Sequence, residues 1–257
     1  MTDNILVADN LTKQFGGLKA VGGDTGLNFG VKRGSLVGLI GPNGAGKSTI
    51  FNLISGVLEP SSGRVRLNGK SLAKIKSSEI ASHGLGRTFQ TPRAFPSLTV
   101  LENVLVGAKS SGEHLSSVFS GKWKVDDISL KKKASEVIQK VGLEDRIGDT
   151  VANLSGGELR MLEVARQLIR DPAILLLDEP TAGVDPSLQG KLSSILVELH
   201  NEGKTLIVVE HNLHFLLSIA DVVLVLQNGE LLAEGSPTEI QNNKRVIAAY
   251  LGDEYAA

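Results

Sequence analysis

Residues 41–49 read GPNGAGKST, and this stretch decides the fold. The phosphate-loop pattern G-x-x-x-x-G-K-[ST] is matched at Gly41, Gly46, Lys47 and Ser48. Glycines let successive backbone N–H groups point at one anion, and a following helix aims its positive end at the same place. Lys47 supplies a cation for the β- and γ-phosphates, and the Ser48 hydroxyl can ligate Mg²⁺. The stretch therefore predicts a polyphosphate site.

The residues on either side support the motif. Ser35–Ile40 is an apolar run of strand length, and residues 50–54 have apolar side chains at helical spacing. Strand, glycine loop and helix are the arrangement that the motif requires. The alternative is a glycine-rich turn that matches the pattern by chance, and this context argues against it.

Composition limits the class of protein. At 257 residues, the chain can bury a sizeable core, as one domain or as a large domain with a small lobe. With 41% hydrophobic and 21% charged residues it is typical of a soluble globular protein, and a net charge of −1 gives no reason to expect nucleic acid. The absence of cysteine excludes disulfides, thiolate metal sites and a cysteine nucleophile.

No apolar run approaches the ~20 residues of a membrane-spanning helix. The first residues, MTDNILVADN, lack the basic-then-apolar layout of a signal peptide. We therefore expect a cytoplasmic protein, whose membrane role, if any, comes through a partner.

Periodicity divides the chain into strand-rich and helical parts. Strands are expected at 5–9, across 27–40 and at 64–68, and helices at 99–108 and 130–141, separated by a polar surface insertion at 110–129. Buried strands at 173–177 and 206–209 then flank a helix at 186–201, and a hairpin closes the chain at 222–234. The pattern predicts a single α/β domain over 1–257: a phosphate-loop core (about 1–90 and 161–257) with an antiparallel β edge, and an inserted helical lobe at about 91–160.

The segment ILLLDEP at 174–180 is a buried strand that ends in two carboxylates, Asp178 and Glu179. Ligands of parallel α/β sheets bind beyond the carboxyl ends of the strands, which places both acids beside the phosphate loop. Asp178 would hold Mg²⁺ through water, and Glu179 would orient and polarise the water that attacks the γ-phosphate. The alternative is a strand end with solvated acids.

The signature segment, LSGGE at 154–158, opens a helix that is expected to run to about Arg170. Ser155 and Glu158 form a capping box, so a well-capped helix without further function is the simplest interpretation. Glycines in a first turn weaken a helix but expose its N–H groups to an anion. Gly156 and Gly157 therefore suggest a second phosphate-binding surface, one that serves the nucleotide of another subunit.

The order of these motifs resembles the nucleotide-binding subunit of ABC transporters. The phosphate loop, LSGGE, ILLLDEP and then Val209-Glu210-His211 follow each other as in that family, over nearly the whole chain. The resemblance implies an ABC-type ATPase fold, ATP and Mg²⁺ as cofactors, and ATP hydrolysis coupled to transport.

The resemblance also implies roles for individual residues. Glu179, His211, Gln90 and Lys47 would be catalytic, with His211 contacting the γ-phosphate and Gln90 sensing Mg²⁺ and the γ-phosphate. Mg²⁺ would be held by Ser48, Gln90 and Asp178. ATP would be held by an aromatic residue on the adenine, by the phosphate loop and by the signature of a second subunit: Phe15, Gly41, Pro42, Asn43, Gly44, Ala45, Gly46, Lys47, Ser48, Thr49, Ser155, Gly156, Gly157 and Glu158. Considered alone, Phe15, Gln90 and His211 could each be merely structural.

Two positions depart from the family pattern. Glu158 stands where glutamine is commonest. Ala182 stands where serine is usual in the segment 182–185 that contacts the second subunit. Neither touches Lys47, Asp178 or Glu179, so hydrolysis is expected to survive and only the contact across the dimer is in question.

The stretch GRTFQTPRAFPSLTVLENVLVGA, the VEHN segment and the ending AAYLGDEY are similar to the ATPase subunit of bacterial branched-chain amino-acid importers. This resemblance implies a second ATPase subunit, membrane permeases and, indirectly, a substrate-binding protein as partners, with the chain peripheral on the inner face of the membrane. ABC ATPases for urea, other hydrophobic amino acids or lipopolysaccharide export, a soluble ABC ATPase and a regulator without turnover are the alternatives.

The expected permease contact lies at 90–101. Phe95, Pro96 and Leu98 form an apolar cluster on an otherwise polar segment, and an exposed apolar patch commonly marks a contact surface. The alternative is that these side chains pack inside the lobe.

Overall fold

The computed structural model describes residues 3–73, 75, 77–91, 93–108 and 122–251. The chain divides into two compact units. The core unit comprises Met1–Arg87, Ala173–Pro180 and Leu196–Ala257, and the helical unit comprises Thr88–Pro172 and Thr181–Ile195. The inserted helical lobe expected at about 91–160 stays a prediction.

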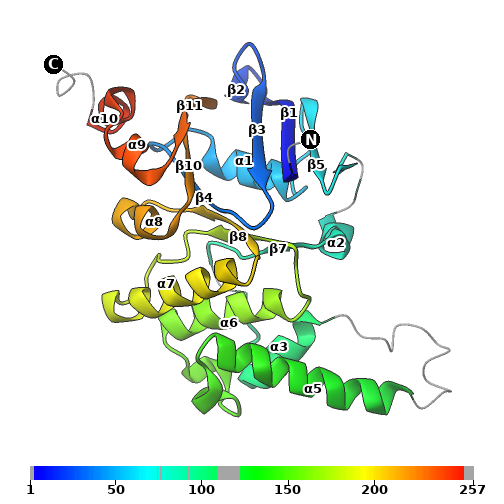
Figure 1. Ribbon diagram of the computed structural model, residues 1–257. Coiled ribbons are helices and arrows are strands. Elements are labelled where there is room, and N and C mark those ends of the chain that lie inside the picture. Colours follow the sequence, from blue (N-terminus) through cyan, green and yellow to red (C-terminus); the bar gives the residue numbers. More distant parts are fainter. Residues whose placement is uncertain (1–2, 74, 76, 92, 109–121, 252–257) are drawn as a thin grey trace. The chain divides into compact units, whose positions relative to one another are not determined.

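A mainly parallel sheet runs through the core unit (Figure 1). In spatial order its described strands are β11 (Glu230–Gly235), β10 (Val222–Gln227), β4 (Leu36–Ile40), β9 (Thr205–Val209), β8 (Ile174–Asp178) and β7 (Leu85–Arg87). Only β11 is antiparallel to its neighbour, as the predicted hairpin requires. All five residues of β4, of β8 and of β9 are buried, which explains why these strands are continuous apolar runs.

An antiparallel sheet forms the other layer of strands in the core unit. Its described members are β1 (Asn4–Phe15), β2 (Leu18–Val21), β3 (Leu27–Lys32), β5 (Ser62–Leu67) and β6 (Lys70–Ser71). The long strand β1 pairs antiparallel with β2, β3 and β5. The apolar stretch at 27–40 is thus two strands that belong to different sheets, β3 and β4.

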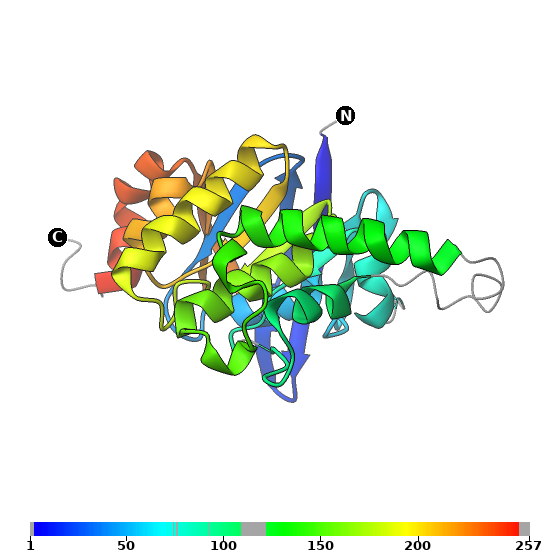
Figure 2. The same ribbon diagram turned by 90° about the horizontal axis from the view of Figure 1, so that it is seen from below.

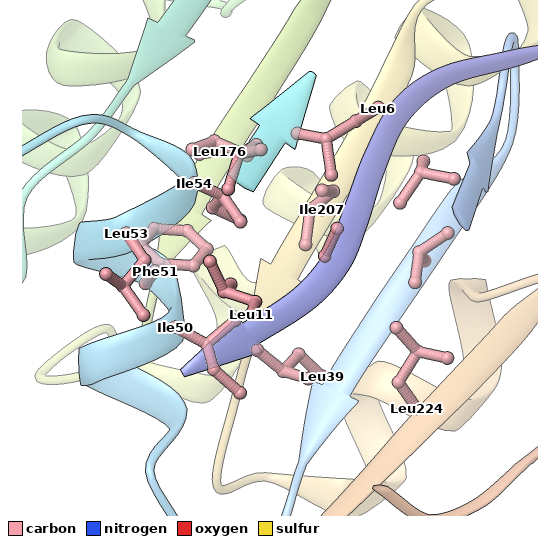
Figure 3. Close-up of a cluster of buried hydrophobic side chains, with 14 of the residues drawn as sticks. Leu6, Leu11, Leu39, Ile50, Phe51, Leu53, Ile54, Leu176, Ile207 and Leu224 are labelled. Atoms are coloured by element: carbon pink, nitrogen blue, oxygen red, sulfur yellow. The ribbon is translucent and has the colours of Figure 1, made fainter. Parts of the chain in front are cut away.

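Between the sheets lies one apolar core, to which α1 (Lys47–Ile54) contributes (Figure 3). Leu11 comes from the antiparallel sheet, Leu39 and Leu176 come from the parallel sheet, and Phe51 comes from α1. On the opposite face of β4, a Cβ added at Gly38 would lie 2.7 Å from a methyl carbon of Leu216, so α8 (Leu213–Ile219) packs there. This packing fixes the start of α1 at the carboxyl end of β4.

Shorter elements complete the core unit. They are α2 (Ser77–Ile80), η1 (Ala81–His83), α9 (Pro237–Gln241) and α10 (Lys244–Leu251). Both α9 and α10 contact β11.

The helical unit consists of α3 (Val100–Gly107), α5 (Lys122–Lys140), η3 (Glu144–Arg146), η4 (Val151–Asn153), α6 (Gly156–Leu168) and the first turns of α7 (Pro186–Asn201). Figure 2 shows α5, the long green helix, beside α3, and both contact α6. A Cβ at Gly107 would lie 2.6 Å from the Arg166 carbonyl oxygen, so the end of α3 approaches the backbone of α6 closely.

Two sequence-based boundaries are wrong. The strand expected at 5–9 extends to Phe15 in β1. The helix expected at 130–141 begins eight residues earlier, because α5 starts at Lys122 and takes in the second half of the polar segment 110–129. The mean hydropathy of α5 is low, and a polar stretch of this kind can be either an exposed helix or a loop. Residues 109–121 of that segment lie outside the described residues.

The core makes a direct stability prediction. Phe51 is fully buried and has the Arg87 guanidinium 5.2 Å from its ring centroid. Phe51→Ala should lower the free energy of unfolding by about 3–5 kcal/mol, since it removes a large side chain from a packed site. Val57, the nearby control, is 53% exposed, and Val57→Ala should change the free energy by less than about 0.5 kcal/mol. Equal shifts in the urea midpoints would contradict this description of the core.

Candidate functional site

A cleft of about 490 Å³ opens in the core unit at the phosphate loop. Its size is that of ordinary small-ligand sites. Its lining joins the loop to the ends of β1, β9 and β10, through Phe15, Leu18, Lys19, Ala20, Asn43, Gly44, Ala45, Gly46, Lys47, Ser48, Thr49, His211 and Asn228.

The loop conformation depends on glycine at two close approaches. A Cβ at Gly41 would lie 2.3 Å from the Leu226 carbonyl oxygen, and one at Gly46 would lie 2.7 Å from the Ala20 carbonyl oxygen. Gly46, at φ 97°, is the N-cap of α1 and offers no side chain to the first turn. The first N–H groups of α1 are therefore left for an anion, and the helix dipole favours the same charge.

Lys47 is 7% exposed and turned back over its own loop. Its ammonium donates to the carbonyl oxygens of Gly41 at 2.6 Å and Pro42 at 3.1 Å. Burial lowers the pKa of Lys47, and the negative charge of Glu179 opposes this shift. A buried ammonium that is held mainly by carbonyl dipoles makes stronger hydrogen bonds when a phosphate approaches, because the phosphate carries a full negative charge.

Glu179 and His211 meet at the ends of neighbouring parallel strands. Glu179 follows β8 directly, and His211 lies two residues beyond β9. Glu179 adopts a left-handed conformation (φ 46°), and its backbone N–H donates to the Val209 carbonyl at 2.9 Å. This turn directs the carboxylate at His211, with 3.1 Å between Oε1 and Nε2. A strained non-glycine residue of this kind is common at functional sites.

Asp178 lies at the end of β8 with only 12% of its side chain exposed. Its Oδ2 is 3.4 Å from Nη2 of Arg87, and Nη1 of the same guanidinium donates to the Ser55 hydroxyl at 2.5 Å. Sequence reasoning missed Arg87. The available signal was a charged residue that ends a strand, β7, in parallel register with β8.

Phe15 is 46% exposed and lines the cleft, so it is not a core aromatic. The Lys13 ammonium lies 5.2 Å from its ring centroid. An exposed ring at the rim of a phosphate cleft can stack on a planar ligand.

The signature segment lies in the helical unit, and its capping box is complete. The Glu158 N–H donates to the Ser155 hydroxyl oxygen at 3.3 Å, while the N–H and the hydroxyl of Ser155 both donate to Glu158 Oε2 at 2.8 Å. Arg146 donates to Glu158 Oε1 at 3.1 Å and to Asp149 at 2.9 Å. Glu158 thus has a structural task in addition to any contact with a nucleotide.

Packing explains one of the two signature glycines. A Cβ at Gly157 would lie 2.4 Å from a methyl carbon of Leu188, whereas one at Gly156 would reach only ordinary contact, 3.4 Å from the Gly183 carbonyl oxygen. A larger residue at Gly157 would therefore force the Leu188 side chain of α7 to move. The packing of Gly156 does not require glycine, and the missing side chain leaves the first turn of α6 accessible.

The remaining predicted residues also belong to the helical unit. Gln90 is exposed, and its carbonyl accepts from Arg160. Phe95 is 46% exposed, with the Arg166 guanidinium 5.5 Å from its ring centroid, and its backbone N–H donates to the buried Asn103 at 2.8 Å. Pro96 is exposed and Leu98 partly so.

The core unit brings together the phosphate loop, Phe15, Asp178, Glu179 and His211.

Known proteins share these features. Residues 25–182, more than half of the chain, match the family described as ABC transporter, and residues 230–256 match one described as Branched-chain amino acid ATP-binding cassette transporter. A probable branched-chain amino acid transport ATP-binding protein, LivG of Archaeoglobus fulgidus, is 39% identical over 96% of this chain and 95% of its own. The chain belongs to the ABC transporter family.

Solved structures of ABC cassettes agree with this assignment. The ADP conformation of an ATP-binding cassette of an ABC transporter superposes with a TM-score of 0.84, at 34% identity over 97% of this chain and 99% of the other. A dimeric bacterial ABC transporter cassette gives 0.73, at 28% identity over 90% and 98%. The predicted α/β fold of ABC ATPase type is confirmed, and so is the assignment as an ATP-binding and hydrolysing transporter subunit.

Among the described residues, no helix combines the length and apolar composition that crossing a membrane demands.

The capping box makes the stability of this ABC ATPase depend on pH. Hydrogen bonds from Ser155 and Arg146 hold the pKa of Glu158 below its ordinary value of 4.5, the Ser155 backbone N–H contributing most. The ionised carboxylate therefore stabilises the fold above pH 4.5, and this contribution is lost as the pH falls through the folded-state pKa. Glu158→Gln keeps the capping geometry but cannot ionise.

We expect wild type to unfold with a higher free energy than Glu158→Gln above about pH 5, and this difference should shrink as the pH falls below 4.5 and through the lowered folded-state pKa of Glu158. Urea titrations of both proteins at matched pH measure it. A difference that stays constant over this range would show that the charge of Glu158 does not stabilise α6.

Proposed function

We propose that this ATPase drives import of branched-chain or other hydrophobic amino acids through partner permeases. The meeting of Glu179 and His211 at the carboxyl edge, next to the phosphate-loop cleft, is the observation that carries the catalytic part. The substrate class is supported by the family match at 230–256 and by the name of the Archaeoglobus fulgidus relative.

The chemistry we propose is positioning and charge neutralisation. The N–H groups of the loop and the Lys47 ammonium would hold the β- and γ-phosphates, with Phe15 against the adenine. Glu179 would orient the attacking water and accept its proton. His211, already 3.1 Å from Glu179, would keep that carboxylate aimed and contact the γ-phosphate.

Mg²⁺ fits the oxygen donors in this region. The Ser48 hydroxyl lines the cleft, and the Asp178 carboxylate ends β8. Nucleotide-bound Mg²⁺ needs only one or two protein oxygens, because phosphates and water supply the rest. This agrees with the lack of a cluster of three or more His, Cys, Asp or Glu able to hold a metal among the described residues. The bound ion would neutralise charge on the phosphates, and Gln90 would sense it.

The second ATPase subunit would supply the signature. Gly156 leaves the start of α6 open to an anion, and dimeric cassettes are known among the solved relatives. Each ATP would therefore lie between the phosphate loop of one subunit and Ser155–Gly157 of the other. Ala182 removes one hydroxyl from this contact.

The permeases would contact the segment 90–101 at the inner face of the membrane. Phe95 and Pro96 are exposed, which favours a docking surface over packing inside the lobe. A substrate-binding protein would act through the permeases and need not touch this chain.

Reconstitution tests the function. Vesicles that contain the chain, its partner permeases and the substrate-binding protein should take up leucine only with ATP. Glu179→Gln should bind ATP but lose at least ~100-fold in turnover and uptake, the usual contribution of a general acid–base group. Near-normal hydrolysis by Glu179→Gln would contradict the catalytic assignment. Uptake of urea in place of leucine would overturn the substrate class alone.

Dimerisation tests the shared site. Glu179→Gln should be monomeric without nucleotide and dimeric with ATP by light scattering, because ATP binds both surfaces and is not consumed. Adding Ser155→Arg should keep it monomeric, since the long side chain would fill the anion-binding start of α6. A dimer that persists in the double variant would refute the shared site.

A further inference from the structure

One stripe of α6 is directed at the backbone of Phe89, Gln90 and Arg93. Arg160, Glu163 and Arg166 are spaced three apart, so they lie along one side of the helix. All three reach main-chain groups of that segment: Glu163 accepts from Phe89, Arg160 donates to Phe89 and Gln90, and Arg166 donates to the Arg93 carbonyl.

Of these three side chains, Glu163 accepts a backbone hydrogen bond, and the two arginines donate. Its Oε1 receives the Phe89 N–H at 2.7 Å, and the residue is 4% exposed. Arg160, 7% exposed, donates to the Phe89 carbonyl at 2.9 Å, to the Gln90 carbonyl, and at 3.5 Å to the Ala182 carbonyl. The two side chains lie 3.5 Å apart as an ion pair.

Burying a carboxylate carries a cost, which is visible in the pKa of Glu163: burial raises it, against the opposing effects of the Phe89 N–H and Arg160. Such a charge is retained only where hydrogen bonds and a counter-ion compensate for the lost water. Here the Phe89 N–H and the Arg160 guanidinium compensate the Glu163 carboxylate, and the same guanidinium binds the Phe89 and Gln90 carbonyls. The pair therefore fixes the direction of the main chain from which the Gln90 side chain departs.

We propose that Glu163 is a positioning residue for Gln90: by accepting the Phe89 N–H and holding Arg160 against the Phe89 and Gln90 carbonyls, it fastens the backbone of Gln90 to the signature helix. The inference rests on the role proposed above for Gln90 as the sensor of Mg²⁺ and γ-phosphate. Glu163 itself touches neither nucleotide nor water in this scheme. Its loss should therefore affect turnover more than ATP affinity.

The variants separate positioning from general destabilisation. Glu163→Ala removes the acceptor of the Phe89 N–H and the carboxylate that pairs with Arg160. Glu163→Gln keeps a carbonyl oxygen for the Phe89 N–H. Leu162→Ala is the matched control, because Leu162 is a fully buried neighbour on α6 whose side chain has no hydrogen-bonding group. Steady-state ATPase kinetics, melting temperature and hydrogen exchange of the Phe89 amide are measured for each.

Glu163→Ala should lower kcat by about 10–100-fold while KM for ATP changes less than about 3-fold, the split expected for an interaction needed only in the transition state. The Phe89 amide should exchange at least about 10-fold faster, because it loses its acceptor. Glu163→Gln should recover most of both effects. Leu162→Ala should lower the melting temperature but leave kcat and Phe89 exchange within about 2-fold of wild type.

Three results would overturn the proposal: unchanged Phe89 exchange in Glu163→Ala, a loss of kcat no larger than in Leu162→Ala, or no recovery in Glu163→Gln. Should Glu163→Ala fail to fold, the double variant Glu163→Gln/Arg160→Lys replaces it, because it weakens the interaction between positions 160 and 163 without deleting either side chain. Gln90→Ala separates the two ideas. If Gln90→Ala is fully active, the role of Gln90 fails and the positioning role with it. If Gln90→Ala is impaired while Glu163→Ala is not, only the positioning role fails. Additive losses of kcat in the double variant Gln90→Ala/Glu163→Ala would also count against the positioning role.

Discussion

The close approach of Gly41 to the Leu226 carbonyl is the constraint on which the rest of the core unit depends. A Cβ there would lie 2.3 Å from that oxygen, so a larger residue would push β4 and β10 apart at the carboxyl edge. Val225 of β10 pairs with Ile40, the residue before Gly41. Because the chain turns at this glycine, α1 starts over the end of the sheet and places its uncapped N–H groups where Glu179 and His211 also emerge. The phosphate-loop side of the cleft thus follows from strand pairing in the parallel sheet, while Phe15 of β1 and the first residues of β2 line its other side.

The electrostatics of the cleft favour an anion before any ligand is present. Lys47 is buried, and its pKa is lowered by that burial even though Glu179 carries a compensating charge. Two carbonyl dipoles hold the ammonium in the meantime. A polyphosphate would replace those dipoles with full charges, which strengthens each hydrogen bond. Glu179 would then lose part of its interaction with Lys47 and keep His211, which suits a base that must face water.

Much of the core unit could be predicted from the sequence because its signals are local. The phosphate loop, the run ILLLD, the helix at 186–201 and the hairpin across Asn228-Gly229 are each complete within a few residues, and each lies where it was expected. The start of α5 was not predicted because Lys122–Ser129 is polar, and a low hydropathy does not distinguish an exposed helix from a loop. Arg87, Glu163 and Leu188 could not be assigned, since their partners are 31 to 91 residues away or on another element. The roles of the individual site residues stay predictions for the same reason: they depend on a ligand and a second subunit.

The departure at Glu158 illustrates how a local compensation can make an unusual residue acceptable. A carboxylate at the start of a helix that should receive an anion would repel it. Yet Glu158 Oε2 already accepts the N–H and the hydroxyl of Ser155, and Oε1 accepts from Arg146. The guanidinium therefore offsets the charge of Glu158 within hydrogen-bonding distance. Its second partner, Asp149, holds the arginine in place. The backbone N–H groups at this helix start, which Gly156 leaves accessible, would then carry the attraction for a phosphate. The Ser155 hydroxyl must give up its bond to Glu158 before it can donate elsewhere, so closing the dimer on ATP would exchange one charge-assisted hydrogen bond for another.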